Sequence, residues 1–141
     1  MAISNSLILI THAPLLPPPN EWETAAGAVV DFWGVVRALE DGREISGIEY
    51  EAHEQMARHQ MEILATQAQE KFSLEAVILQ HRIGFVATGE ASLFLRSTSR
   101  HRAAAFAGSE WIIAELKKRV PIWKRPLFVR QEEAPPRVVG R

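Results

Sequence analysis

The chain has 141 residues, of which 47% are hydrophobic and 23% are charged, and its formal net charge is −1. These values indicate a single globular domain, which we place at residues 1–130, and argue against a general nucleic-acid or membrane-surface binder. The absence of cysteine excludes disulfides, thiolate metal sites and a persulfide carried by this chain.

The N-terminal residues predict a strand followed by an extended loop. Residues 3–11 predict a strand at a sheet edge. Prolines at positions 14, 17, 18 and 19 predict that residues 13–24 form a connecting loop, with Trp22 fixing it to the body of the domain. The apolar run near the N-terminus is too short for a signal peptide or a membrane span, so we expect a cytoplasmic location.

Two strands and a helix are predicted next. Residues 27–37 are rich in β-branched and aromatic side chains and predict a strand. Gly34 inside it predicts a bulge or the close approach of a ligand or second backbone, and Arg37 at its end is most simply a solvated charge. Residues 45–51 predict a strand and residues 52–72 an amphipathic helix. Its predicted inward-facing residues are Met56, Ile63, Leu64, Ala68 and Phe72.

The middle of the chain offers no metal site. His53 and His59 lie six residues apart, which is not the i, i+4 spacing of a helical metal pair. Residues 74–84 and 90–98 predict two strands around a turn at Gly89. For His81 and Arg82, at the end of the first of these strands, a paired or solvated strand end is the favoured explanation.

A long helix dominates the last third of the chain. Ser99 is a suitable N-cap, and Pro121 disfavours helical geometry at Val120, so the helix ends there or just before. Apolar residues recur between them with the helical period: Ala105, Phe106, Ile112, Ile113, Leu116 and Val120. Residues 122–130 predict a final strand that Pro126 keeps at an edge, and residues 131–141 a flexible tail.

Two lysines at the end of this helix differ in position. At about 100° per residue, Lys117 lies on the border of the apolar arc next to Phe106, whereas Lys118 faces solvent. Partial desolvation would lower the pKa of Lys117 towards a range useful in acid–base chemistry. A basic residue in the last helical turn is also commonplace, because it complements the macrodipole.

His101 and Arg102 lie in the first turn, where the helix dipole already favours anions. Binding of a phosphate would explain cations there, and so would a surface ion pair. Arg102 is fifteen residues from Lys117, or roughly 22 Å along the axis. Either the two ends form separate sites, or a two-fold dimer brings one chain's His101 and Arg102 to its partner's Lys117.

The predicted order β, β, β, α, β, β, α, β indicates an α+β domain, with two main helices packed on a largely antiparallel sheet. Within residues 27–125, three segments carry a family resemblance: FWGVVR (32–37), SRHRAAAF (99–106) and LKKRVPIWK (116–124). The segments IEYEAHEQM (48–56) and HRIG (81–84) agree with them. Together they resemble the large, catalytic subunit of molybdopterin synthase.

The resemblance implies a sulfurtransferase of molybdenum cofactor biosynthesis, with a hammerhead-like subdomain and no permanently bound cofactor. Such enzymes convert cyclic pyranopterin monophosphate to molybdopterin. The sulfur arrives as a thiocarboxylate on the C-terminal Gly-Gly of a small ubiquitin-like subunit, whose tail enters the large subunit's pocket. The family forms a large-subunit homodimer with one small subunit at each end, a heterotetramer. The absence of cysteine fits sulfur delivered from outside.

Carried over by matching motif, Lys117 and Lys124 are the catalytic residues. His101 and Arg102 match a pair that reaches across the dimer to the substrate. The residues expected to bind substrate are Val35, Val36, Arg37, His101, Arg102, Arg125 and Pro126. Pro126 stands where the family usually has an acidic residue, and the family's tryptophan-containing C-terminal segment is replaced by LFVRQEEAPPRVVGR. Two alternatives are a non-catalytic paralogue that binds a ubiquitin-like tail or an anionic small molecule, and an unrelated enzyme that uses Lys117 and Lys124 on a phosphate ligand.

Overall fold

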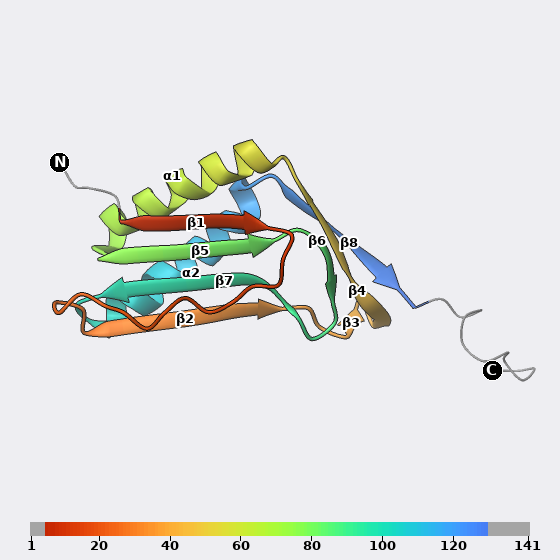
Figure 1. Cartoon of the computed structure of the whole chain (residues 1–141), viewed down its shortest axis with the longest axis horizontal. Helices are drawn as coiled ribbons and strands as arrows, with labels where there is room; N and C mark the ends of the chain where they lie inside the picture. The colour runs from red at the N-terminus through yellow and green to blue at the C-terminus, as the bar shows by residue number, and fades with distance from the viewer. Residues whose placement is uncertain (1–4, 130–141) are drawn as a thin grey trace, which may run out of the picture.

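The computed structural model describes residues 5–129 (Figure 1). Eight strands and two helices follow one another in this part of the chain. In chain order they are β1 (Ser6–Thr11), β2 (Ala28–Val35), β3 (Leu39–Glu40), β4 (Arg43–Ala52), α1 (Glu54–Phe72), β5 (Ala76–Arg82), β6 (Gly84–Ala87), β7 (Ala91–Ser99), α2 (Arg102–Arg119) and β8 (Ile122–Phe128).

The main layer is a four-stranded sheet in the order β1-β5-β7-β2, with both helices on one face (Figure 1). Strands β1 and β5 are parallel, and the other neighbours are antiparallel. The strands place alternate apolar side chains against the helices. The core contains Met61, Leu64, Val77, Leu79, Leu93, Leu95, Ile112 and Leu116. The predicted α+β class and the edge position of β1 are confirmed.

A second, smaller sheet lies beside the end of the first and has its own core. Strand β4 runs through it, pairing with β3, β6 and β8. Its core contains the buried side chains of Val36, Ile45, Ile48 and Val86. Strand β8 pairs only with β4 among the described residues, so Pro126 lies on an edge strand as predicted. This sheet corresponds to the subdomain that the family resemblance implies.

The beginning of α2 differs from the prediction. Ser99 is buried as the last residue of β7, and its hydroxyl donates to the backbone oxygen of His101. His101 is the N-cap instead, with extended backbone and no side-chain capping bond. Phe106 was predicted to be buried but is 61% exposed. The helix ends at Arg119 with Val120 as C-cap, which confirms the predicted stop.

Helix α1 begins after His53, whose Nδ1 accepts from the backbone amide of Met56 and caps the first turn. The prediction that Met56 faces inward is wrong, because its side chain is 52% exposed. Met61 is fully buried in its place. Leu64 and Ala68 are buried as predicted.

The strand predicted at residues 74–84 is in fact two strands in different sheets. Strand β5 ends at Arg82, and Gly84 begins β6 with a φ of 87°. This left-handed conformation is accessible to glycine at no steric cost, so the chain can turn into the second sheet. The predicted turn at Gly89 is confirmed, with a φ of 89°.

The proline-rich loop crosses the face of β7 and β2 that lies away from α2 (Figure 1). Arg96 of β7 holds it, donating to the backbone oxygen of Pro19 at 2.8 Å and to the side-chain oxygen of Asn20 at 3.1 Å. The same guanidinium donates twice to Asp31 on β2, at 2.7 and 2.9 Å. Trp22 is 49% exposed, and the guanidinium of Arg96 lies over its ring, 5.9 Å from the centroid. Trp22 therefore contributes to fixing the loop as predicted, together with the hydrogen bonds of Arg96.

No helix within residues 5–129 is long and apolar enough to cross a membrane. The tail predicted at residues 131–141 lies outside the described residues.

Candidate active site

A cavity of about 450 Å³ opens where the two sheets meet the C-terminal end of α2. Three parts of the fold contribute to it: the main sheet through β2, β5 and β7, the second sheet, and the end of α2. Its lining residues are Phe32, Gly34, Val35, Tyr50, His81, Ser92, Leu93, Ile113, Leu116, Lys117, Val120, Ile122 and Lys124. The two predicted catalytic lysines are therefore in one cavity.

The helix stop explains how Lys117 and Lys124 meet. Lys117 lies in the last turn of α2, and Pro121 sends the chain into β8. Strand β8 then runs antiparallel to β4, which places Lys124 opposite Tyr50. The ammonium of Lys124 lies 3.6 Å from a carboxylate oxygen of Glu40.

The predicted partial desolvation of Lys117 is not seen in the single chain, where its side chain is exposed. Lys118 faces solvent as predicted and lies 3.4 Å from Glu115 of the same helix. Lys117 and Lys118 thus differ in access to the cavity rather than in burial.

A bulge in β2 shapes one wall. Strand β2 pairs with β7, and the register shifts between Gly34 and Val35, which confirms the predicted irregularity. A Cβ on Gly34 would lie 3.2 Å from the Cβ of Leu93. The glycine therefore lets the two strands approach closely, and the bulge leaves Val35 exposed in the cavity wall.

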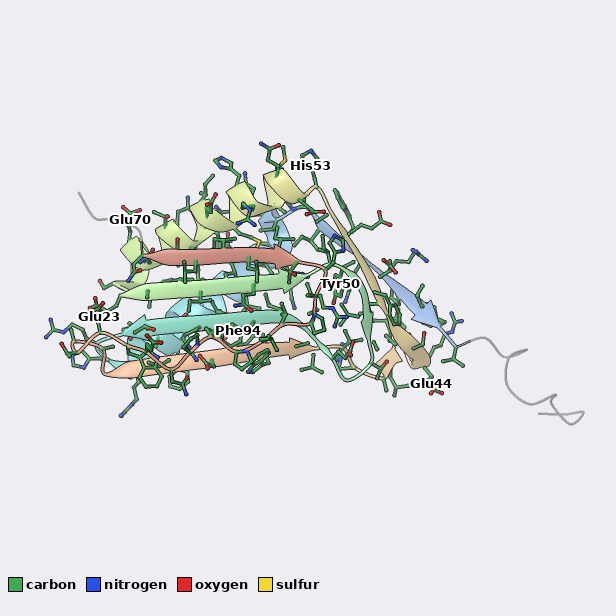
Figure 2. All side chains as sticks on the ribbon, in the orientation of Figure 1. Glu23, Glu44, Tyr50, His53, Glu70 and Phe94 are labelled. Carbon is green, nitrogen blue, oxygen red and sulfur yellow. The ribbon has the colours of Figure 1, made fainter. Side chains whose placement is uncertain are left out.

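His81 is a lining residue whose place the sequence did not indicate. Its side chain is 5% exposed, and burial lowers the pKa of its imidazole, an effect that the hydrogen bond to Arg82 partly offsets. Its Nδ1 lies 2.8 Å from the backbone oxygen of Arg82. The imidazole meets the ring of Tyr50 edge-on at 5.1 Å. Figure 2 shows Tyr50 at the junction of the two sheets.

Six of the seven residues predicted to bind substrate do not line this cavity, and Val35 is the exception. Val36 is buried in the core of the second sheet, and its backbone pairs with Glu90 and Gly89. Arg37 follows β2 and is exposed. Arg125 and Pro126 lie on β8 beyond Lys124, opposite Glu49 and Ile48. Because strand side chains alternate, Arg125 projects to the opposite face from Lys124.

His101 and Arg102 are exposed at the other end of α2. The helix separates them from Lys117 by its whole length, so one chain does not bring the predicted anion-binding pair and the lysines together. The two ends of α2 are therefore separate within one chain, as the number of residues between them predicts.

A sequence model of the MoaE protein family matches residues 11–119, which is more than half of the chain. The chain belongs to the MoaE family. The molybdopterin synthase catalytic subunit of Thermoplasma volcanium is 40% identical over 103 residues, covering 73% of this chain and 75% of that protein.

Solved structures agree with this assignment to the MoaE family. The crystal structure of molybdopterin synthase from Staphylococcus aureus matches with a TM-score of 0.78 at 28% identity, covering 85% of this chain and 90% of that one. A complex of subunits 1 and 2 of the molybdopterin-converting factor from Helicobacter pylori matches with a TM-score of 0.61 at 25% identity, covering 76% and 74%.

Proposed function

We propose that this MoaE-family chain is the catalytic subunit of a molybdopterin synthase. It is a sulfurtransferase of molybdenum cofactor biosynthesis that converts cyclic pyranopterin monophosphate to molybdopterin. The observation that carries this proposal is that Lys117 and Lys124, which come from two different elements, line the same cavity. The family to which the chain belongs supports it.

The sulfur arrives on the C-terminal thiocarboxylate of a small subunit, because this chain has no cysteine to carry it. The Helicobacter pylori structure is a complex of subunit 1 with subunit 2 of the molybdopterin-converting factor, which supports a small-subunit partner here. The mouth of the cavity carries two exposed ammonium groups that attract an anionic tail. Ammonium groups can also polarise the terminal carbonyl and donate protons to leaving groups. We assign these roles to Lys117 and Lys124.

The substrate phosphate needs cations beyond the two lysines. We assign Arg37, His101 and Arg102 to it, since arginine side chains and a helix N-terminus both favour a phosphate. Within one chain, His101 and Arg102 lie at the opposite end of α2 from the cavity. We therefore propose a two-fold homodimer in which the partner supplies them, with one small subunit for each large subunit.

The dimer face that we propose is the edge formed by β2 and α2. Strand β2 is eight residues long and is an edge strand of the sheet among residues 5–129, so its outer backbone groups can pair with another chain. A groove of about 670 Å³ lies between β2 and α2, and Phe32, Phe106 and Ile113 contribute to its lining. Contact with a second copy would cover the exposed ring of Phe106.

Reconstitution tests the proposed function. The purified chain is mixed with a small subunit bearing a C-terminal thiocarboxylate and with cyclic pyranopterin monophosphate, and molybdopterin is measured. We expect conversion that depends on the thiocarboxylate and fails with the plain carboxylate. Tight binding of the small subunit without any conversion would instead identify a non-catalytic paralogue. The predicted cytoplasmic location stays a prediction.

A further inference from the structure

The cavity contains many hydrogen-bond donors and one nitrogen acceptor. Its lining side chains include two ammonium groups, from Lys117 and Lys124, and two hydroxyl groups, from Tyr50 and Ser92. The other lining residues apart from His81 are apolar or glycine. Among the lining residues within 5–129, His81 is therefore the only one whose side chain, as a neutral imidazole, can present a nitrogen lone pair as an acceptor.

The hydrogen bond to Arg82 fixes which nitrogen of His81 carries that lone pair. Nδ1 lies 2.8 Å from the backbone oxygen of Arg82, and a carbonyl oxygen only accepts, so Nδ1 bears the hydrogen. In the neutral ring Nε2 is then the acceptor. Nε2 makes no hydrogen bond to any residue among 5–129.

Burial favours the neutral ring, and a neighbouring ring restricts its movement. Burial holds the pKa of His81 below its ordinary value, so the imidazole is uncharged over a wider pH range. The edge-on contact with Tyr50, at 5.1 Å between ring centroids, restricts rotation of the imidazole. The acceptor is therefore fixed before a ligand enters.

We propose that Nε2 of His81 accepts a hydrogen bond from an N–H group of the bound pyranopterin and so fixes the orientation of the substrate between the two lysines. The inference rests on the proposed function, which supplies a substrate with several N–H donors. A pterin N–H group that faces Nε2 would lose its hydrogen-bond partner if this acceptor were removed. His81 is then a substrate-binding residue, distinct from the lysines that act on sulfur.

Two neutral substitutions separate the two nitrogens of the ring. In His81→Asn the amide nitrogen replaces Nδ1 and keeps the bond to Arg82, but the Nε2 acceptor is lost. In His81→Gln the longer side chain returns an oxygen acceptor near the place of Nε2. Conversion is measured at saturating thiocarboxylated small subunit, together with thermal unfolding. His59 is an exposed histidine on α1, and His59→Asn is the matched control.

We expect His81→Asn to raise the KM for cyclic pyranopterin monophosphate about tenfold, with kcat changed less than about threefold. His81→Gln should recover most of this loss, and affinity for the small subunit should be unchanged in both. An unchanged KM in His81→Asn overturns the proposal. So does a fall in kcat at constant KM, since that would mean that His81 acts through a lysine.

Nitrogen-15 NMR of the wild-type protein provides a test that does not depend on the variants folding. The protein is titrated with cyclic pyranopterin monophosphate without the small subunit. The Nε2 resonance of His81 should shift, and the Nδ1 resonance should keep the chemical shift of a protonated nitrogen. Saturable binding of the pterin with no change at Nε2 overturns the proposal. Absence of turnover by the wild type would count against the proposed function alone, since this titration needs none.

Discussion

Lys117 and Lys118 are neighbours in the sequence and both are exposed, but only Lys117 lines the cavity. We expect Lys117→Ala to slow molybdopterin formation by more than about tenfold, which corresponds to about 1.4 kcal/mol of activation free energy. Lys118→Ala loses only a surface ion pair with Glu115 and should keep nearly full activity. Equal rates for the two variants in the reconstituted assay would refute the role of Lys117.

His81 gives the stability of the protein a defined pH dependence. Its folded pKa lies below the ordinary value, because burial disfavours the charged ring. Between the folded pKa and the ordinary value the unfolded chain binds a proton that the folded chain does not. The free energy of unfolding therefore falls as the pH decreases through this window, and His81 contributes no slope above it.

Urea unfolding of the wild type and of His81→Asn, from about pH 7 to about pH 5, measures this contribution. We expect the wild type to lose more stability than the variant over this range, whatever their difference at neutral pH. His59→Asn, which removes an exposed imidazole, should follow the wild type. Parallel curves for the wild type and His81→Asn would show that the buried ring does not titrate as described.

At the scale of elements, Arg96 joins the proline-rich loop to the main sheet. Its side chain is 4% exposed and donates to Asp31, Pro19 and Asn20. Arg96→Met keeps the length of the side chain but removes these hydrogen bonds. We expect a loss of about 2 kcal/mol in the free energy of unfolding and faster proteolysis within residues 13–24. Chemical denaturation and limited proteolysis measure the two effects.

Asp31→Asn is the matched variant for this anchor. It removes the charge that faces Arg96 but leaves the guanidinium bonds to Pro19 and Asn20 available. Proteolysis of the loop should therefore rise less than in Arg96→Met. If the two variants are cleaved equally fast, the contact with the loop is not what Arg96 contributes.

Most elements could be predicted from the sequence because apolar periodicity and turn residues identify them locally. The errors share a cause, which is that a pattern does not say what an element packs against. Phe106 fits the helical period but faces the groove beside β2. Ser99 has the chemistry of an N-cap, but pairing with Ala28 keeps it in β7. Strand β6 was not predicted as a separate strand, because the strand-like pattern of residues 74–84 is unbroken and the chain turns only at Gly84.

The candidate site divides in the same way. Lys117 and Lys124 were predicted by motif, and the turn at Pro121 made their meeting foreseeable. His81 was not foreseeable as a cavity residue, because its burial depends on β4 bringing Tyr50 over the end of β5. Local sequence patterns do not indicate which side chains are brought into a site by the pairing of strands that are far apart in the chain.

At the scale of the whole molecule, the proposed homodimer makes a prediction that a monomer cannot meet. In the proposed dimer each site contains Lys117 of one chain and His101 and Arg102 of the other. The double variant His101→Ala/Arg102→Ala therefore alters the partner's site, and Lys117→Ala alters the site of its own chain. Each variant alone should keep less than about a tenth of the wild-type activity. Mixed and allowed to exchange subunits, they form hybrid dimers in which one of the two sites is intact, so about half of the dimers should regain half of the activity.

The activity regained on mixing, about a quarter of the wild-type rate, is measured in the reconstituted assay. Each variant mixed with wild type provides the control for exchange. No recovery, although mass spectrometry shows hybrid dimers, would mean that both groups belong to the same chain's site.

The two lysines stand on parts of the protein with separate cores, Lys117 on the helical layer and Lys124 on the second sheet. The second core contains four buried residues, so it should melt before the first. Warming should then abolish sulfur transfer while circular dichroism still reports intact helices. Activity would then be lost by local, reversible unfolding of the second sheet, which separates Lys124 from Lys117 at a temperature below that of global unfolding.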